Sequence, residues 1–235
     1  MAGREILSVA RLGTIEYRAA LELQDALVEA RQQERIGDLL LLLEHPQVYT
    51  LGRGANERFI VAPPRDVPIY RVSRGGQVTY HGPGQLVGYP ILKLDGAARD
   101  VHGYLRALEQ VVIDALARCE ITAGRRDGLT GVWVDRRKIA SLGVGIRRWT
   151  TLHGFAVNVT ADLGRFDAIV PCGIEGCVMT SVAAEGRPEI SVDTFADLVQ
   201  ERFATLFDYD KLRMIEAADL GAAIERRAAV CQTSS

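Results

Sequence analysis

The sequence predicts a single-domain α/β (α+β) protein in which a mixed β-sheet is flanked by helices. Three observations support this prediction. The chain has 235 residues, 48% hydrophobic and 25% charged, which is enough for one full core. Apolar residues recur at helical spacing in three long segments, with short β-rich runs between them. No internal repeat, low-complexity tract or compositional break marks a linker, so the domain is expected to span residues 1–235.

The first elements alternate between strand and helix. Residues 6–12 are a strand candidate, and Thr14 is expected to cap a helix that ends near Arg35. The unbroken apolar run Leu39–Leu43 is typical of a strand covered on both faces, and Val48–Leu51 is expected to lie beside it. These runs predict a layered core.

The middle of the chain is rich in strands. Glycines and prolines make residues 52–68 a loop, and three glycine-punctuated strands follow at 69–72, 78–80 and 86–94. Further on, three β-rich runs joined by short breaks predict an antiparallel meander; they are 131–134, 138–149 and 151–159.

Two further helices show clear periodicity. Asp100 is expected to cap the first, whose apolar stripe runs from Val101 to Cys119. The second is expected over about 192–207, and the Ala- and charge-rich tail at about 220–235 is expected to be peripheral or frayed.

The charge and cysteine content limit the possible partners and compartment. The formal charge is 28 − 30 = −2, so nothing draws the whole chain toward nucleic acid or an anionic membrane. No stretch has the apolar length of a signal sequence core or a membrane span, which predicts a cytoplasmic protein. In that reducing compartment the four cysteines are expected to be thiols.

Cys172 is the first candidate for chemistry. It lies between Pro171 and Gly173 at the end of an apolar run, and a basic tract with Lys138 lies upstream. A cysteine reacts as the thiolate, which a nearby ammonium stabilises. By base rates, however, a buried structural cysteine is the more frequent case, so both readings stay open on these residues alone.

A second candidate is the glycine-rich segment from Arg74 to Gln85, with four glycines and a proline. Such backbone exposes N–H groups and lets a ligand approach closely. Neither GxGxxG nor GxxxxGK[ST] occurs here, and a tight structural loop explains the segment equally well. His81 alone is expected to be a structural hydrogen-bonding residue.

Four ordered motifs together resemble those of the lipoyl(octanoyl) transferases. They are Arg74-Gly-Gly-x-x-Thr-x-His81-Gly-Pro-Gly-Gln85, Lys138-Ile-Ala-Ser-Leu-Gly143, Leu152-His-Gly-Phe-Ala-Val-Asn158 and Pro171-Cys-Gly-Ile174. The likeness runs from about Leu12 to Phe207. It implies the catalytic fold shared by biotin and lipoate protein ligases.

The resemblance also implies an activity and a site. An octanoyl or lipoyl group would pass from acyl carrier protein to Cys172, with Lys138 as its partner, and then to a lysine of a lipoyl domain. As ammonium, Lys138 would hold the thiolate; as amine, it could accept the proton of the incoming lysine. The segments that would line the substrate site contain Arg74, Gly75, Gly76, Gln77, Val78, Thr79, Tyr80, His81, Ser141, Leu142, Gly143, Gly154, Phe155 and Ala156.

The implied partners are octanoyl-acyl carrier protein, the lipoyl domains of 2-oxoacid dehydrogenases and the glycine cleavage H protein. No cofactor is implied, because the acyl group arrives on the phosphopantetheine of the carrier. No metal is expected: Cys172 and Cys177 have the widest spacing of a zinc pair, and no histidine follows at finger spacing.

Acidic partners would need a local basic patch, and five arginines are candidates: Arg53, Arg136, Arg137, Arg147 and Arg148. For any one of them a solvated surface role is as good an explanation. Two positions depart from the family pattern, where Gln77 and Gly145 stand in place of basic residues.

Three other functions remain as alternatives. A lipoate or biotin protein ligase on the same fold would need ATP and Mg²⁺. A non-catalytic binding module would have no use for a Cys/Lys pair. A cysteine hydrolase would release free octanoate.

Overall fold

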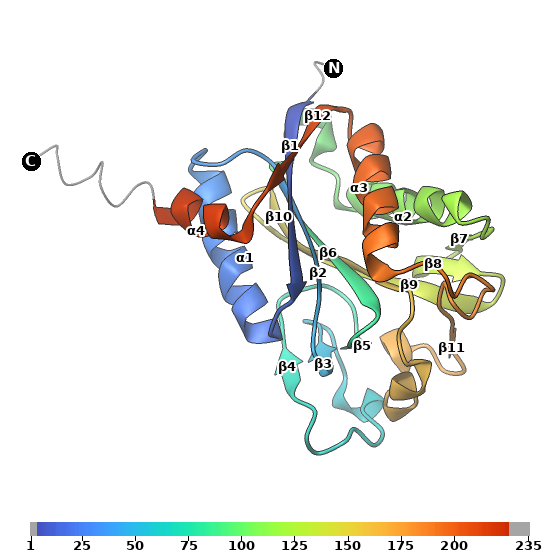
Figure 1. Cartoon of the computed structure of the whole chain (residues 1–235). Helices are drawn as coiled ribbons and strands as arrows, with labels where there is room; N and C mark the ends of the chain where they lie inside the picture. The colour runs from blue at the N-terminus through green and yellow to red at the C-terminus, as the bar shows by residue number, and fades with distance from the viewer. Residues whose placement is uncertain (1–3, 226–235) are drawn as a thin grey trace, which may run out of the picture.

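A mixed nine-stranded β-sheet lies at the centre of the computed structural model, which describes residues 4–225 (Figure 1). The strand order is β12-β1-β2-β6-β10-β9-β8-β7, with β11 beside β9. Strands β12, β1 and β2 run parallel, and β2 to β7 are antiparallel neighbours. The strands are β1 (Arg4–Thr14), β2 (Leu39–Glu44), β6 (Gln85–Ile91), β7 (Gly124–Arg126), β8 (Leu129–Val134), β9 (Arg137–Arg147), β10 (Thr150–Asn158), β11 (Val178–Met179) and β12 (Tyr209–Ile215).

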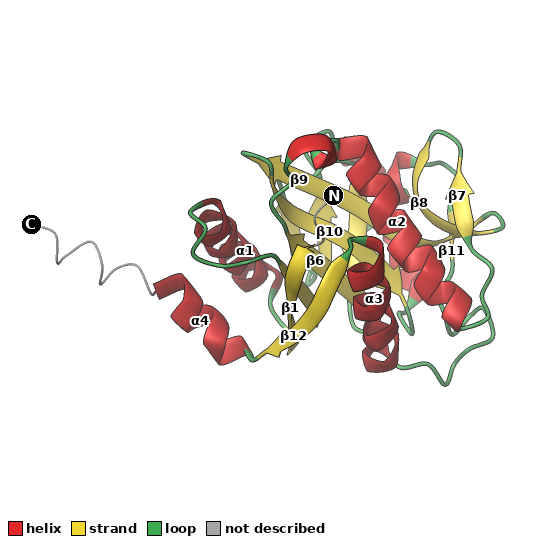
Figure 2. Cartoon of the chain, turned by 90° about the horizontal axis from the view of Figure 1, so that it is seen from above, coloured by secondary structure: helices red, strands yellow, loops and turns green. Residues whose placement is uncertain are grey.

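Helices cover both faces of this sheet, as Figure 2 shows from above: α2 (Val101–Arg118) and α3 (Val192–Leu206) lie on one face, α1 (Tyr17–Gln32) and α4 (Ala217–Glu225) on the other. Each face has its own buried apolar cluster. The predicted mixed sheet flanked by helices is confirmed, and so is the antiparallel meander, formed by β8, β9 and β10.

A second, three-stranded sheet was not predicted. It has the order β4-β3-β5 and consists of β3 (Val48–Leu51), β4 (Ile69–Arg71) and β5 (Val78–His81). The prediction that Val48–Leu51 lies beside Leu39–Leu43 is therefore wrong. Both edges of β2 are already occupied, by β1 and β6, so no third strand can pair with it.

Four short 3₁₀ segments lie in the connections. They are η1 (Glu57–Phe59), η2 (Gly96–Ala98), η3 (Leu163–Ala168) and η4 (Pro171–Gly173). The last of these carries Cys172 and lies next to the small sheet, since η4 contacts β5. The small sheet and η4 together build one side of the site described below.

The predicted cap of the first helix is also wrong. Thr14 is the last residue of β1, where it pairs with Glu44, and the Ile15 N–H still donates to the Glu44 carbonyl at 3.0 Å. Strand pairing thus continues past Thr14, and α1 begins only after Glu16, which makes no side-chain cap. By contrast Asp100 does cap α2, accepting from the His102 N–H at 3.0 Å, and Cys119 is buried at the end of that helix.

The C-terminal part holds two elements that the sequence did not predict. Strand β12 is an edge strand whose side chains are mostly exposed. Its alternation of charged and apolar residues is typical of a half-buried strand, and sequence reasoning missed this signal. Helix α4 lies at the start of the tail and buries Leu220. Residues 226–235 lie outside the part of the chain described.

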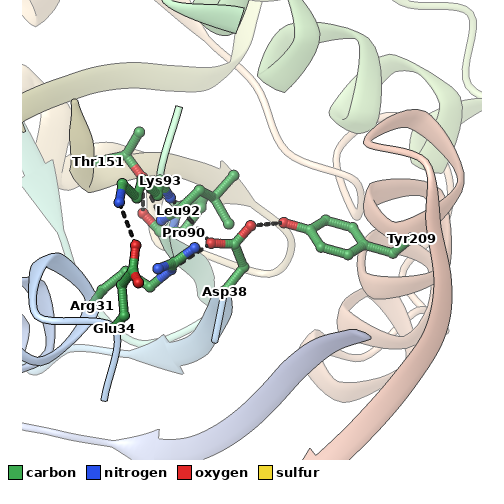
Figure 3. Close-up of polar contacts among 8 residues, drawn as sticks. All are labelled: Arg31, Glu34, Asp38, Pro90, Leu92, Lys93, Thr151 and Tyr209. Carbon is green, nitrogen blue, oxygen red and sulfur yellow. Dashed lines mark hydrogen bonds and ion pairs between the residues drawn. The ribbon is translucent and has the colours of Figure 1, made fainter. Parts of the chain in front are cut away.

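A buried carboxylate ties β12 to the rest of the molecule (Figure 3). One Asp38 oxygen accepts from Arg31 Nε at 2.8 Å and from the Lys93 N–H at 3.1 Å, and the other accepts from the Tyr209 hydroxyl at 2.7 Å. This Asp38 cluster joins the end of α1, the end of β6 and the start of β12.

Within residues 4–225, none of the helices has both the length and the apolar character needed to cross a membrane.

Candidate active site

Lys138 and Cys172, 34 positions apart in the chain, meet in the folded structure. Lys138 Nζ donates to Cys172 Sγ at 2.9 Å and to the Thr130 carbonyl at 3.0 Å. The Ser141 hydroxyl lies 3.9 Å from the same sulfur. An amine, a thiol and a hydroxyl therefore converge on one point.

The Lys138 ammonium has no carboxylate to pair with among the described residues. The side chain extends from β9 and is fully buried, with Nζ 5.3 Å from the centre of the Trp133 ring. No acidic residue in the described range forms an ion pair with it. Desolvation penalises a buried ammonium, so a thiolate at Cys172 is the partner that would balance it.

Room for the lysine depends on Gly131 in the neighbouring strand. This residue has φ +136°, and a Cβ there would lie 2.5 Å from Lys138 Cε and 3.0 Å from Nζ. The Gly131 N–H donates to Glu109 Oε1 at 2.9 Å. Glu109 is a buried carboxylate of α2 that also binds Arg125 and Arg106, so it supports the strand segment whose carbonyl accepts from Lys138.

Cys172 has an uncommon backbone conformation. Its φ is +57° and its ψ is 13°, within η4, where Pro171 precedes it. Gly173 follows with φ +70°, and a Cβ there would lie 2.9 Å from the Phe59 ring. Strained left-handed residues tend to occur at functional sites. Here the turn holds the sulfur toward β9.

A cavity of about 220 Å³ opens beside the sulfur and extends across β9, β10 and β6. We call it the Cys172 cavity. Most of the residues that were expected to line the substrate site do line it: Arg74, Gly76, Gln77, Val78, Thr79, His81, Ser141, Leu142, Gly143, Gly154, Phe155 and Ala156. The two that do not are Gly75 and Tyr80.

Both exceptions have a structural reason. Side chains alternate along a strand, so Thr79 and His81 face the cavity while Tyr80 packs on the other side against Tyr49 and Phe166. The Gly75 N–H donates to the Val144 carbonyl at 3.0 Å, which makes this residue part of the cavity's support.

Sequence reasoning missed part of the lining. The additional residues are Tyr17, Val87, Tyr89, Gly128, Leu129, Thr130, His153 and Ile174. His153 and Ile174 belong to two of the four motifs quoted above, whereas no sequence signal marks the other six, because each fits an ordinary amphipathic helix, strand or turn. Only the crossing of α1 over β6 and β10 brings Tyr17 and Tyr89 to the cavity.

Arg74 places a second buried positive charge at this cavity. Its guanidinium donates to the Thr50 carbonyl and hydroxyl, both at 2.8 Å, and to the Gly75 carbonyl at 3.0 Å. Nε has no hydrogen-bond partner among the described residues. Burial lowers the pKa of Arg74, and nearby Tyr17 and Cys172 oppose that effect.

Three histidines near the cavity are buried and held neutral. Burial lowers the pKa of His45 to about 4, of His81 to about 3 and of His153 to about 4. His81 Nδ1 lies 2.7 Å from Gln85 Oε1, which agrees with the expected structural role, and His45 bridges the Ile15 carbonyl and the Tyr89 hydroxyl.

The other described cysteines differ from Cys172. Burial raises the pKa of the Cys119 thiol and of the Cys177 thiol. Neither has an ammonium within hydrogen-bond distance in the described part of the chain. No group of three or more His, Cys, Asp or Glu side chains within residues 4–225 is arranged to hold a metal ion.

The candidate steering arginines fall into two groups. Arg137 binds Glu185 through two bonds of 2.9 Å, and Arg147 binds Asp25 at 2.7 Å. The Arg53 guanidinium donates to the Ser73 carbonyl at 3.3 Å, while Arg136 and Arg148 are exposed with no ion pair among the described residues. The second group is therefore the freer to meet a partner.

Comparisons with known proteins identify the family of this chain. The family model described as "Lipoyl protein ligase A/B catalytic domain" matches residues 16–204, and the chain belongs to this family. An octanoyltransferase of Solibacter usitatus is 49% identical over 218 residues, which is 91% of this chain and 97% of that relative. One of Geobacter metallireducens is 45% identical over 88% of this chain and 96% of its own length. Within the larger family, the chain is thus a member of the octanoyltransferases.

Solved structures support the fold. A lipoate-protein ligase A bound with ATP has a TM-score of 0.70 at 18% identity, covering 96% of this chain and 93% of its own. A putative lipoate protein ligase from T. acidophilum with bound lipoic acid has a TM-score of 0.69 at 18% identity, over 96% of this chain and 94% of that one. The predicted likeness to the ligase catalytic fold is confirmed.

Proposed function

We propose that the chain transfers an octanoyl group from acyl carrier protein to a lysine of a lipoyl domain, with Cys172 as the covalent carrier. The observation that supports this best is the 2.9 Å contact between Lys138 Nζ and Cys172 Sγ at the Cys172 cavity, in a member of the octanoyltransferase family. A lipoyl group would be transferred by the same route.

The first half-reaction charges the cysteine. The thiolate of Cys172, balanced by the Lys138 ammonium, attacks the carbonyl carbon of the octanoyl thioester, and a new C–S bond forms. The bond to the pantetheine sulfur then breaks. Lys138 gives its proton to that leaving sulfur, so the products are octanoyl-Cys172, a neutral Lys138 amine and the carrier thiol.

The second half-reaction restores the pair. The neutral amine of the acceptor lysine attacks the octanoyl carbonyl, and its proton passes to Lys138 as the C–N bond forms. The bond to Cys172 then breaks, which releases the amide product and leaves the thiolate beside the ammonium. A thioester is converted to an amide, so no ATP is needed.

The Cys172 cavity is the proposed place for the octanoyl chain. Ser141, Gly143 and Gly154 line it along β9 and β10. At about 220 Å³ it is smaller than the roughly 300–1,000 Å³ of drug-sized sites, as suits one short acyl chain. Burial at about 0.8 kcal/mol per CH₂ would hold an eight-carbon chain firmly.

The proposed partners follow from this chemistry. The donor is octanoyl-acyl carrier protein, and the acceptors are the lipoyl domains of 2-oxoacid dehydrogenases and the glycine cleavage H protein. No further cofactor takes part in either half-reaction. Arg53, Arg136 and Arg148 are the proposed contacts for these acidic proteins. A reduced Cys172 is required throughout, which fits a cytoplasmic location.

The intact mass of the protein after mixing with octanoyl-acyl carrier protein tests the proposal, in the absence of ATP. We expect a single octanoyl adduct that is missing in Cys172→Ala and moves to an added lipoyl domain. Cys177→Ala is the matched control and should keep the adduct. Labelling that requires ATP and free octanoate would instead indicate a ligase, and free octanoate released despite the acceptor would indicate a hydrolase.

A further inference from the structure

A second cavity lies behind the Cys172 cavity. It has about 160 Å³ and is lined by α1, by residues 71–73 and by the first part of β10; we call it the Gln24 cavity. His153 is the one described residue that lines both cavities. The two spaces are therefore neighbours separated by this side chain.

The same three chain segments build both spaces. In each segment, one residue lines the Cys172 cavity and another, at most one helical turn away, lines the Gln24 cavity. The three pairs are Tyr17 and Leu21, Arg74 and Ser73, and Gly154 and Leu152. In the pairing of β10 with β9, His153 lies opposite Val144, three residues along the strand from Ser141, whose hydroxyl lies 3.9 Å from the sulfur. His153 therefore lies at a part of the cavity lining away from Cys172.

The backbone directs His153 into this position. The φ of His153 is +56°, which interrupts the regular strand. The pairing of β10 with β6 ends at Phe155. The His153 N–H donates to Gln24 Oε1 of α1 at 2.8 Å in place of a strand partner. A histidine in a left-handed conformation costs free energy, and such strain persists where the surroundings enforce it.

The imidazole ring of His153 makes few hydrogen bonds. It is buried, with 2% of its surface exposed, and its one hydrogen bond among the described residues joins Nε2 to the Ser73 hydroxyl at 3.2 Å. Within residues 4–225, neither His153 Nδ1 nor Gln24 Nε2 has a hydrogen-bond partner. A terminal methyl group cannot form hydrogen bonds with these unpaired polar atoms. An alkyl chain therefore gains no free energy by extending beyond the imidazole.

We propose that the His153 side chain is the wall at which the acyl chain ends, and that it sets the upper limit of chain length for this enzyme. The inference rests on the proposed acyl transfer and names the residue that determines its specificity. The Gln24 cavity is the space into which a longer saturated acyl chain would extend once the imidazole is removed.

Glycine is the substitution that tests this wall, because φ +56° suits glycine and the backbone should keep its shape. The assay is the rate of Cys172 acylation, by intact mass, with octanoyl-, decanoyl- and dodecanoyl-acyl carrier protein. For His153→Gly we expect the dodecanoyl to octanoyl ratio of kcat/KM to rise at least tenfold. The physical limit is about fourfold for each CH₂ that becomes buried. His153→Asn, which also tolerates this φ, should give a smaller rise.

Asp208→Gly is the matched control, since Asp208 also has a positive φ but is exposed and lines neither cavity. Its chain-length ratio should equal that of the unmodified protein. An unchanged ratio in both folded His153 variants, while octanoyl still charges Cys172, would overturn this inference alone. Absence of any adduct in the unmodified protein would overturn the proposed function and the inference with it.

Discussion

Two buried charges in this molecule, Asp38 and Lys138, are accommodated in opposite ways. Asp38 accepts from Arg31, from the Lys93 N–H and from Tyr209, so both carboxylate oxygens have protein donors (Figure 3). Lys138 meets a carbonyl and a sulfur but no carboxylate of the described part of the chain. A buried charge with fixed partners holds elements together, whereas a buried charge balanced by a reactive atom is available for chemistry.

The difference explains why a carboxylate beside Lys138 would be harmful. The carboxylate would form a permanent ion pair with the Lys138 ammonium. A thiolate at Cys172 would then no longer be required to balance that charge. At the Asp38 cluster the same permanence is useful, because three elements from distant parts of the chain meet there.

Removing the ammonium should have the largest effect. Lys138→Met keeps the buried volume but removes the charge and the proton, so we expect acyl transfer to fall about 10²–10⁴-fold. Alkylation of Cys172 by iodoacetamide at pH 7, followed by peptide mass analysis, should slow as well. Lys138→Arg is the control: it keeps a charge but cannot release its proton, so alkylation should suffer less than transfer. Equal transfer rates in all three proteins would exclude Lys138 as the partner.

Removing the Asp38 carboxylate should lower the free energy of unfolding without changing the rate of acyl transfer. Asp38→Ala leaves Arg31 and Tyr209 without their buried acceptor, and we expect the free energy of unfolding to fall by about 3 kcal/mol in urea titrations. Tyr209→Phe removes one bond and should cost about 1 kcal/mol. The kcat/KM of the folded fraction should stay within twofold; a loss as large as that of Lys138→Met would remove the distinction between the two sites.

The buried histidines add a pH dependence to stability. The pKa of His45 and of His153 is about 4 in the folded protein, below the usual value near 6.5. Unfolding therefore takes up protons as the pH falls below about 6.5. This contribution is fully present above that pH and is lost between 6.5 and 4, with a slope of up to about 1.4 kcal/mol per pH unit for each histidine.

Urea unfolding measured at several pH values between 7.5 and 4.5 checks this slope. His45→Asn should flatten the curve between pH 6.5 and 4.5. An identical curve in the variant would mean that burial does not hold His45 neutral.

A smaller effect on catalysis than at Lys138 is expected at Glu109, which combines features of the Asp38 and Lys138 sites. This buried carboxylate is ion-paired like Asp38, yet it also holds the Gly131 N–H beside Lys138. Glu109→Gln should lower kcat about tenfold with little change in the KM for the carrier, because it shifts the Thr130 carbonyl without touching substrate. Arg106→Gln, which removes a partly exposed arm of the same cluster, should leave kcat unchanged.

Much of the fold and of the candidate site could be predicted from the sequence. The α2 stripe with its Asp100 cap, the meander of β8 to β10 and the motifs around Lys138 and Cys172 follow from periodicity and residue order. The small sheet could not be predicted in this way, because β3 looks like any buried strand until the edges of β2 are known to be occupied. The alternation along β12 is a strand signal, but it lies in a charged tail whose side chains are mostly exposed, and it was overlooked.

The sequence by itself determined the composition of the core, the nature of the reactive groups and the family to which the chain belongs, because these depend on residue types and their local order. Only the tertiary structure decided which groups meet. The 2.9 Å approach of Lys138 to Cys172 and the place of His153 between two cavities arise from the crossing of distant segments. Such contacts depend on the closure of long loops, which local patterns do not record.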